Sequence, residues 1–278
     1  MAESKEQSKD IVSALASFSA PPLSIVFHPS IVRSTSTTHG AGLLSTNPIQ
    51  SSEALVRTPF TSTISILSIP YIDPPWPVSF LEFYDDRPEI ITRFLLLELR
   101  AQGNKGKWWS YIDSLPKEFD TPLWWSDEDR AWLEGTNLFG ASQIRYKQWK
   151  QEYEDGMRHL LPTLSHEQQQ HYTWEVYLWA STVLSSRSFT QEVVRSYKEP
   201  CQISSAFANS KLAKRWIEDD KNLRFPVLLP GLDVANHNPD TEAVWVSSDD
   251  TVTFKRQDDL GANVDICNNY GAKGTEEC

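Results

Sequence analysis

The sequence predicts an α+β protein in which a mostly-β domain of short strands is split by a helical insertion. Runs of β-prone residues, separated by turn residues, occupy both ends of the chain. The middle instead carries helix-start and helix-stop signals, and eight of the 11 tryptophans lie between residues 108 and 179. We therefore expect a polar N-terminal segment at 1–22, the first part of the β domain at 23–82, the helical insertion at 83–205 and the second part of the β domain at 206–278.

The first part of the chain favours strands and turns. Residues 1–20 are largely polar and predict only a short helix over Ile11–Phe18. Beyond them, β-prone runs lie between Pro, Gly, Ser and Asn residues, which is typical of short strands joined by tight turns. The strands expected here are residues 25–27, 54–56 and 63–69.

Helix signals begin after residue 83. Pro88 suits the first turn of a helix and Gly103 ends it, which predicts a helix over residues 88–102. Ser126 precedes three acidic residues, and this is the pattern of a capped helix start whose dipole the acids complement. Gly135 is expected to end that second, shorter helix.

The end of the insertion carries a capping-box pattern. Ser165 is followed three residues later by Gln168, and we expect a long helix from this point to about Ser186. Its large aromatic residues, with the other tryptophans of the insertion, favour an aromatic helical core over an aromatic ligand cage. The chain then returns to short β-prone runs at 225–229, 243–246 and 251–255.

Composition and charge limit the functions that the chain can have. Its 278 residues are 40% hydrophobic and 12% aromatic, enough to build a substantial core. A net charge of -11 disfavours electrostatic binding to nucleic acid, although acidic surfaces can attract basic peptides. The three cysteines form no CxxC pair, which supports neither a zinc cluster nor a disulfide framework. With no signal peptide or membrane span apparent in the sequence, we expect a cytoplasmic or nuclear protein.

Two closely spaced glycines form the first candidate ligand site. His39 precedes Gly40, Ala41, Gly42 and Leu43, and glycine lets a backbone approach a ligand closely. A dinucleotide-binding fingerprint would need a third glycine and a following helix, and the sequence provides neither. Taken alone, the segment is a weak signal and is more typical of a plain glycine turn.

Three further groups of polar residues follow. Asp233, Asn236 and His237 come after an apolar run, and their side chains could hold a polar ligand or could form a local turn. Tyr270 precedes a glycine and could present its hydroxyl to a pocket, or merely satisfy a neighbouring group. Arg187 lies at the expected end of the long helix, where a cation is common without any further role.

The order and spacing of these groups resemble those of the Rubisco-methyltransferase-like SET proteins. That family carries a G-x-G-L segment, an aliphatic helix followed by W-x-x-Y-x-x-x-L-P, then S-R-x-F, D-x-x-N-H and Y-G-x-K-S-N-E-E. The chain matches these motifs in the same order with Trp109–Pro116, Ser186–Phe189, Asp233–His237 and Tyr270–Glu277. Thr275 and Gly274 are departures within the last motif. The resemblance covers about residues 23–278.

The resemblance implies a SET domain with a helical insertion that transfers a methyl group from S-adenosylmethionine to a lysine of a protein substrate. It places the backbone of the His39–Leu43 segment along the cofactor and Arg187 in contact with it. Asp233, Asn236 and His237 would belong to the cofactor site, with the last two holding the amino-acid and adenine portions. Tyr270 would stand at the methyl-transfer channel as the catalytic residue. No metal, nucleic acid or membrane is implied.

One departure from the family concerns the end of the sequence. A further Y-G-F segment with a second active-site tyrosine, and then a helical substrate-binding domain, are expected after Cys278. The resemblance therefore predicts a truncated form or fragment that methylates slowly, or a protein that has lost activity. Two alternatives to the enzyme remain open at this stage: a SET-like module that binds a protein partner without turnover, and a helical adaptor whose likeness to the family is incidental.

Overall fold

The structure, a computed structural model, describes residues 15–35, 41–73, 75–197, 205–218, 223–248 and 250–271. Its strands are β1 (Val26–Phe27), β2 (Ile31–Ser34), β3 (Gly42–Ser45), β4 (Ala54–Pro59), β5 (Phe189–Thr190), β6 (Pro226–Val227), β7 (Asn236–His237), β8 (Ala243–Ser248), β9 (Thr251–Arg256) and β10 (Asp265–Asn268). Its α-helices are α2 (Val78–Phe83), α3 (Pro88–Ala101), α4 (Trp109–Ser114), α5 (Asp127–Ala131), α6 (Asn137–Leu160), α7 (His166–Gln169), α8 (Trp174–Arg187), α9 (Ser205–Ala208) and α10 (Lys211–Ile217). Five short 3-10 helices join them: η1 (Phe60–Ser62), η2 (Ile66–Tyr71), η3 (Gly103–Lys105), η4 (Leu161–Thr163) and η5 (Gln191–Val194).

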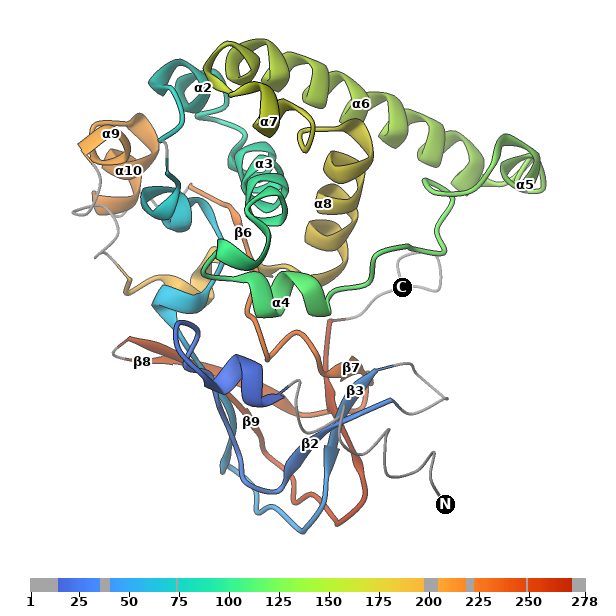
Figure 1. Ribbon diagram of the computed structural model, residues 1–278. Coiled ribbons are helices and arrows are strands. Elements are labelled where there is room, and N and C mark those ends of the chain that lie inside the picture. The colour runs from blue at the N-terminus through green and yellow to red at the C-terminus, as the bar shows by residue number, and fades with distance from the viewer. Residues whose placement is uncertain are drawn as a thin grey trace.

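Strands from the two ends of the chain share the same sheets. One sheet has the order β1-β4-β9-β8, a second has the order β2-β3-β10-β7, and β5 pairs with β6. Figure 1 shows the two four-stranded sheets below and the labelled helices above, with α4 near the junction between them and β6 among the helices. The pairings β4–β9 and β3–β10 join segments about 200 residues apart, so the helical segment is inserted into one β region. The expected domain boundaries at residues 22, 82 and 205 stay a prediction.

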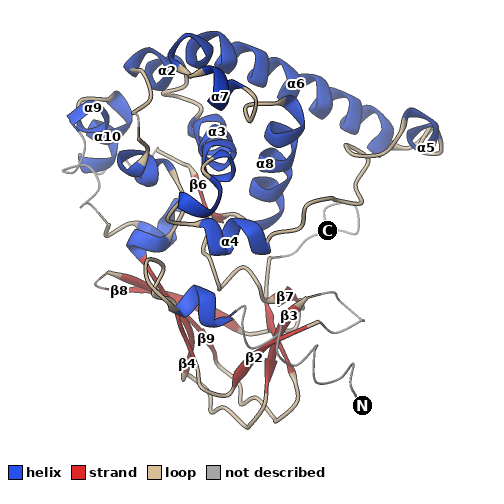
Figure 2. Ribbon diagram, viewed as in Figure 1, coloured by secondary structure: helices blue, strands red, loops and turns tan. Residues whose placement is uncertain are grey.

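The helical part is built on two adjacent helices. α3 carries a continuous run of buried residues from Ile90 to Leu99 and packs against α8, as Figure 2 also shows. The α3 helix begins at Pro88, and Gly103 follows it with a φ of 57°, as predicted from these two residues. Ser126 caps α5 by accepting a hydrogen bond from the Asp129 backbone N–H, which was also expected.

Two of the predicted elements are wrong. Residues 63–69 were expected to form a strand, but residues 66–71 form the 3-10 helix η2, and only Ile64 keeps a single bridge, to Leu228. The reason is local: the Ser65 side chain accepts from the Leu67 N–H while Ser68 bonds back to the Ser65 N–H, which closes a capping box.

The predicted helix from Ser165 to about Ser186 is interrupted. Its capping box is present, but it caps only the four residues of α7. Thr173 then caps a separate helix by accepting a hydrogen bond from the Val176 N–H, so α8 starts anew at Trp174. Thr173, a second cap residue within the expected helix, was the sequence signal for this break.

Candidate active site

The candidate site lies where β3, β7 and β10 meet. β10 pairs antiparallel with β3, placing Ile266 opposite Leu43, and parallel with β7, placing Cys267 opposite Asn236. The glycine segment and the D-x-x-N-H segment, nearly 200 residues apart, therefore lie in one small sheet on either side of β10.

A direct contact explains why Gly42 is a glycine. A Cβ atom added at Gly42 would lie 2.6 Å from Nδ2 of Asn236, closer than real Cβ contacts allow. The absent side chain therefore leaves the room that the Asn236 amide occupies. Ala41, the preceding residue, is exposed and lines a cavity, whereas the Leu43 side chain is 1% exposed and lies in the core. His39 and Gly40 lie outside the described residues.

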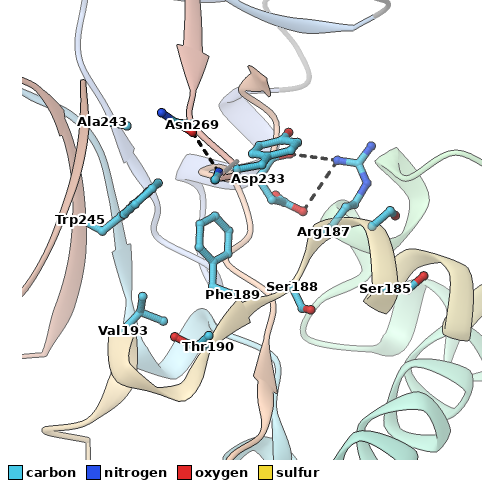
Figure 3. Close-up of a pocket in the computed structure, with 13 residues that line it drawn as sticks. Ser185, Arg187, Ser188, Phe189, Thr190, Val193, Asp233, Ala243, Trp245 and Asn269 are labelled. Atoms are coloured by element: carbon cyan, nitrogen blue, oxygen red, sulfur yellow. Dashed lines mark hydrogen bonds and ion pairs between the residues drawn. The ribbon is translucent and has the colours of Figure 1, made fainter. Parts of the chain in front are cut away.

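Asp233 forms the buried centre of the site. The Tyr111 hydroxyl donates a hydrogen bond to Asp233 Oδ2 over 2.5 Å. Nη1 of Arg187, the last residue of α8, donates to the Asp233 backbone carbonyl over 3.0 Å and lies 3.8 Å from Oδ2. Figure 3 shows the Arg187 guanidinium turned toward Asp233. Asp233 Oδ1 is buried and has no hydrogen-bond partner among the described residues.

Burial dominates the ionisation of this carboxyl. Loss of solvent raises the pKa of Asp233 from 3.8 to about 6, although the nearby Arg187 charge and the Tyr111 hydrogen bond both lower it. Burial next to the Asp233 charge raises the pKa of Tyr111 well above its usual value. At neutral pH the pair is therefore a carboxylate and a neutral phenol.

Tyr270 is held by the D-x-x-N-H segment. Its hydroxyl donates to the Ala235 carbonyl over 2.7 Å, and its backbone N–H donates to Nδ1 of His237 over 3.0 Å. The Tyr270 and His237 rings are stacked, with centroids 5.1 Å apart. Burial raises the pKa of Tyr270, so its hydroxyl is protonated at neutral pH.

Two cavities meet at these residues. The larger, of about 750 Å³, extends past Ala41, Asn236 and His237 toward the 116–123 loop and α6. The smaller, of about 540 Å³, is bounded by Phe189 and Trp245, whose rings meet edge to face (Figure 3). The residues that line both cavities are Ser185, Ser186, Arg187, Asp233 and Tyr270.

The structure thus brings together most of the residues singled out in the sequence. Ala41, Arg187, Asp233, Asn236, His237 and Tyr270 line one or both cavities. Trp245 was not expected at the site, because it lies on β8, where an aromatic residue is ordinary strand composition. Tyr111 was noted only as part of a motif, and its hydrogen bond to Asp233 depends on tertiary contact alone.

The described part of the chain lacks both a metal-binding cluster and a membrane-spanning helix. It contains no group of three or more His, Cys, Asp or Glu side chains placed to hold a metal ion. None of the helices in these ranges combines the length and the apolar composition that a membrane crossing requires.

The chain is similar to known proteins in sequence and in structure. No protein-family model matches the chain. The chain is 32% identical over 188 residues to ribosomal lysine N-methyltransferase set10 of Schizosaccharomyces pombe, which covers 66% of the chain and 29% of that protein. It is 23% identical to SET domain-containing protein 8 of the same yeast, over 86% of the chain and 49% of that protein. The chain therefore spans half or less of the length of these relatives.

A solved structure gives the class of fold. The SET domain of LSMT bound to lysine and AdoHcy superposes with a TM-score of 0.70 over 97% of the chain and 56% of that structure, at 17% identity. The chain therefore has the α+β fold of a SET domain, as predicted. More particularly, its fold is that of the LSMT SET domain, and this confirms the resemblance to the Rubisco-methyltransferase-like proteins that the motifs indicated.

Proposed function

We propose that the chain is a protein-lysine N-methyltransferase that uses S-adenosylmethionine. The sequence relative named a ribosomal lysine N-methyltransferase and the likeness to an LSMT SET domain bound to lysine and AdoHcy support this activity. The name of that relative makes a ribosomal protein the first substrate class to test. A cytoplasmic or nuclear location remains part of the proposal.

A single observation carries the proposal: two separate cavities share the residues Arg187, Asp233 and Tyr270. Methyl transfer from a sulfonium is a displacement in which the amine enters opposite the leaving sulfur. Two ligands must therefore approach one point from different sides. Two cavities that share a group of lining residues suit such an arrangement, which would contribute to the rate through orientation.

The larger cavity suits the cofactor. Its volume of about 750 Å³ lies in the range typical of small-molecule sites, and Asn236, whose amide offers a donor and an acceptor, lines it. S-adenosylmethionine, when bound, supplies an electrophilic methyl group on a positively charged sulfur. The Asp233 carboxylate at the junction provides a compensating negative charge near that position.

The smaller cavity suits a lysine side chain. Phe189 and Trp245 provide apolar walls, and Asp233 and Tyr270 add polar atoms to the lining. A lysine amine has a pKa near 10.4 in water and is therefore charged, whereas only the neutral amine can attack. Apolar walls exclude water, and desolvation lowers the pKa of the amine. Desolvation by these walls therefore favours the reactive neutral amine, whereas the negative charge of Asp233 alone would favour the protonated amine.

The proposal is tested by methyl transfer with the purified chain. Tritiated S-adenosylmethionine is incubated with the chain and a ribosomal protein fraction, and hydrolysed protein is analysed for methyllysine. We expect labelled methyllysine with the wild-type chain and a loss of at least tenfold for Asn236→Ala, because the amide contacts to the cofactor are removed. Asn104→Ala, an exposed residue of η3, is the matched control and should keep wild-type activity.

Three outcomes separate the candidate functions. Labelled methyllysine that depends on Asn236 supports the enzyme. Cofactor binding without transfer to any lysine would contradict the enzyme and favour the binding module. Absence of both binding and transfer would overturn the assignment of the larger cavity as a cofactor site.

A further inference from the structure

Tyr111 lies behind the candidate site and outside both cavities. It belongs to α4, its side chain is 1% exposed, and its ring meets Phe18 edge to face with centroids 6.3 Å apart. Its hydroxyl nevertheless donates the 2.5 Å hydrogen bond to Asp233 Oδ2. A buried tyrosine that only filled the core could equally be phenylalanine, so the hydroxyl points to a role through Asp233.

We propose that Tyr111 is a positioning residue, which holds the Asp233 carboxylate from behind and thereby fixes Arg187 and the Asp233 backbone carbonyl at the junction of the two cavities. The inference rests on the proposed function, because it assigns Tyr111 a part in arranging the same site. Tyr111 itself contacts neither cavity and is therefore not a catalytic residue.

The hydrogen-bond inventory of Asp233 supports this role. Oδ1 has no partner within the described part of the chain, and Arg187 lies 3.8 Å from Oδ2, beyond hydrogen-bond distance. Within the described residues, the Asp233 side-chain oxygens therefore accept their hydrogen bond from the Tyr111 hydroxyl. Without it, the carboxylate would be buried beside a single, longer ion pair.

The same carboxylate controls the position of Arg187. Nη1 of Arg187 contacts both the Asp233 backbone carbonyl at 3.0 Å and the carboxylate at 3.8 Å. Arg33 on β2 adds a second positive charge near Arg187: burial lowers the pKa of Arg33, and repulsion from the Arg187 guanidinium lowers it further. Protonation of Asp233 would remove the negative charge that faces Arg187 and loosen its guanidinium at the junction.

The titratable and charged groups that face Asp233 define the expected pH dependence. They are Tyr111 from α4, Arg187 from the end of α8 and Tyr270 after β10. The hydrogen bond from Tyr111 favours the charged form of Asp233, whose pKa is about 6. Removing the hydroxyl therefore raises the pKa of Asp233 further. In acid titration, the Asp233 carboxylate should therefore become protonated at a higher pH than in the wild type.

The test compares Tyr111→Phe with Tyr172→Phe. Tyr172 is an equally buried tyrosine whose hydroxyl donates to a carboxylate, that of Glu98, but it lies in the helical part and lines neither cavity. Affinity for S-adenosylhomocysteine is measured by calorimetry between pH 5 and 8.5. We expect the acid limb of binding to move up by at least about half a pH unit in Tyr111→Phe and to stay in place in Tyr172→Phe.

A second readout does not need the cofactor. The free energy of unfolding in urea is measured over the same pH range, because the titration of Asp233 contributes to its slope. Tyr111→Phe should move the upper end of that slope to higher pH, and Asp233→Asn should remove it. Coincident pH profiles of Tyr111→Phe and the wild type, in binding or in unfolding, would overturn the inference. If the wild-type chain binds no cofactor while the unfolding profiles shift as expected, the proposed function fails and the Tyr111–Asp233 coupling stands.

If Tyr111→Phe fails to fold, the Asp233→Asn variant tests the inference instead. The amide keeps the size of the carboxyl but cannot titrate, so a folded Asp233→Asn chain should show no acid limb between pH 5 and 7. An unchanged acid limb in that variant would contradict the role assigned to the Tyr111–Asp233 pair.

Discussion

The contact between Gly42 and Asn236 allows a sharp prediction for Gly42→Ala. The new Cβ would lie 2.6 Å from Asn236 Nδ2, whereas ordinary contacts begin at 3.4 Å, so the two groups must separate by about 1 Å. The backbone of Gly42 is that of a paired strand and needs no glycine for its own conformation. The whole effect of the substitution therefore arises from displacement of the Asn236 side chain or of β3.

The magnitude follows from overpacking. Inserting a methyl group into a filled site costs about 1–3 kcal/mol of unfolding free energy. Turning Asn236 about 30° out of its rotamer accounts for about 0.5–1.5 kcal/mol of this. Because the turned amide no longer faces the cofactor, the dissociation constant for S-adenosylhomocysteine should rise at least about tenfold, equivalent to about 1.4 kcal/mol.

A double-mutant cycle makes the prediction specific. In Asn236→Ala the obstructing Nδ2 is absent, so Gly42→Ala in that background should leave the unfolding free energy unchanged within about 0.5 kcal/mol. Urea denaturation measures the stability of the four chains and calorimetry measures cofactor binding. Gly261→Ala is the control, because its new Cβ would meet only Val264 at 3.4 Å. If the effects of Gly42→Ala and Asn236→Ala on stability simply add, the proposed contact is not what makes Gly42 necessary.

Three further substitutions test the physical account of the fold. Burial raises the pKa of Asp233 from 3.8 to about 6, so its contribution to stability is complete below pH 3.8 and is lost as the pH rises through 6, a change of about 3 kcal/mol. Urea denaturation of Asp233→Asn from pH 3 to 8 should not show this change in unfolding free energy, and an unchanged pH slope would refute the assignment. Gly140→Ala in α6 should raise the unfolding free energy by about 0.5–1 kcal/mol, since the added Cβ meets nothing within 4 Å and alanine favours the helix. Gly156→Ala on the same helix should lower it by about 1–2 kcal/mol, because its Cβ would lie 2.3 Å from the buried Phe94 ring; equal signs for the two glycines in thermal or urea unfolding would contradict the packing argument.

Local signals in the sequence predicted those elements that local interactions decide. Pro88, Gly103 and Ser126 each act within one helical turn, and the helix ends that they indicate are present. Local signals also caused the errors, because the serines near residue 65 form a capping box that the β-prone composition concealed. Thr173 likewise restarts a helix that the pattern from Ser165 seemed to continue.

The site itself depended on motif order more than on local pattern. Nothing in the sequence around Gly42 or Asn236 indicates that the two residues touch, because their contact arises when β3 and β7 pair on either side of β10. The matching order of motifs nevertheless identified most of the residues that line the cavities. Trp245 and the Tyr111 hydrogen bond escaped prediction because each depends on packing between elements far apart in the chain.

The central claim is that cofactor and lysine enter from different cavities and meet at the residues that both cavities share. A crystal structure of the chain with S-adenosylhomocysteine and methyllysine tests it most directly. We expect the sulfur in the larger cavity beside Asn236, and the methylated amine in the smaller cavity between Trp245 and Tyr270, with the two atoms facing each other across the junction at Asp233. Both ligands in one cavity, or a cofactor bound away from Asn236, would contradict the account.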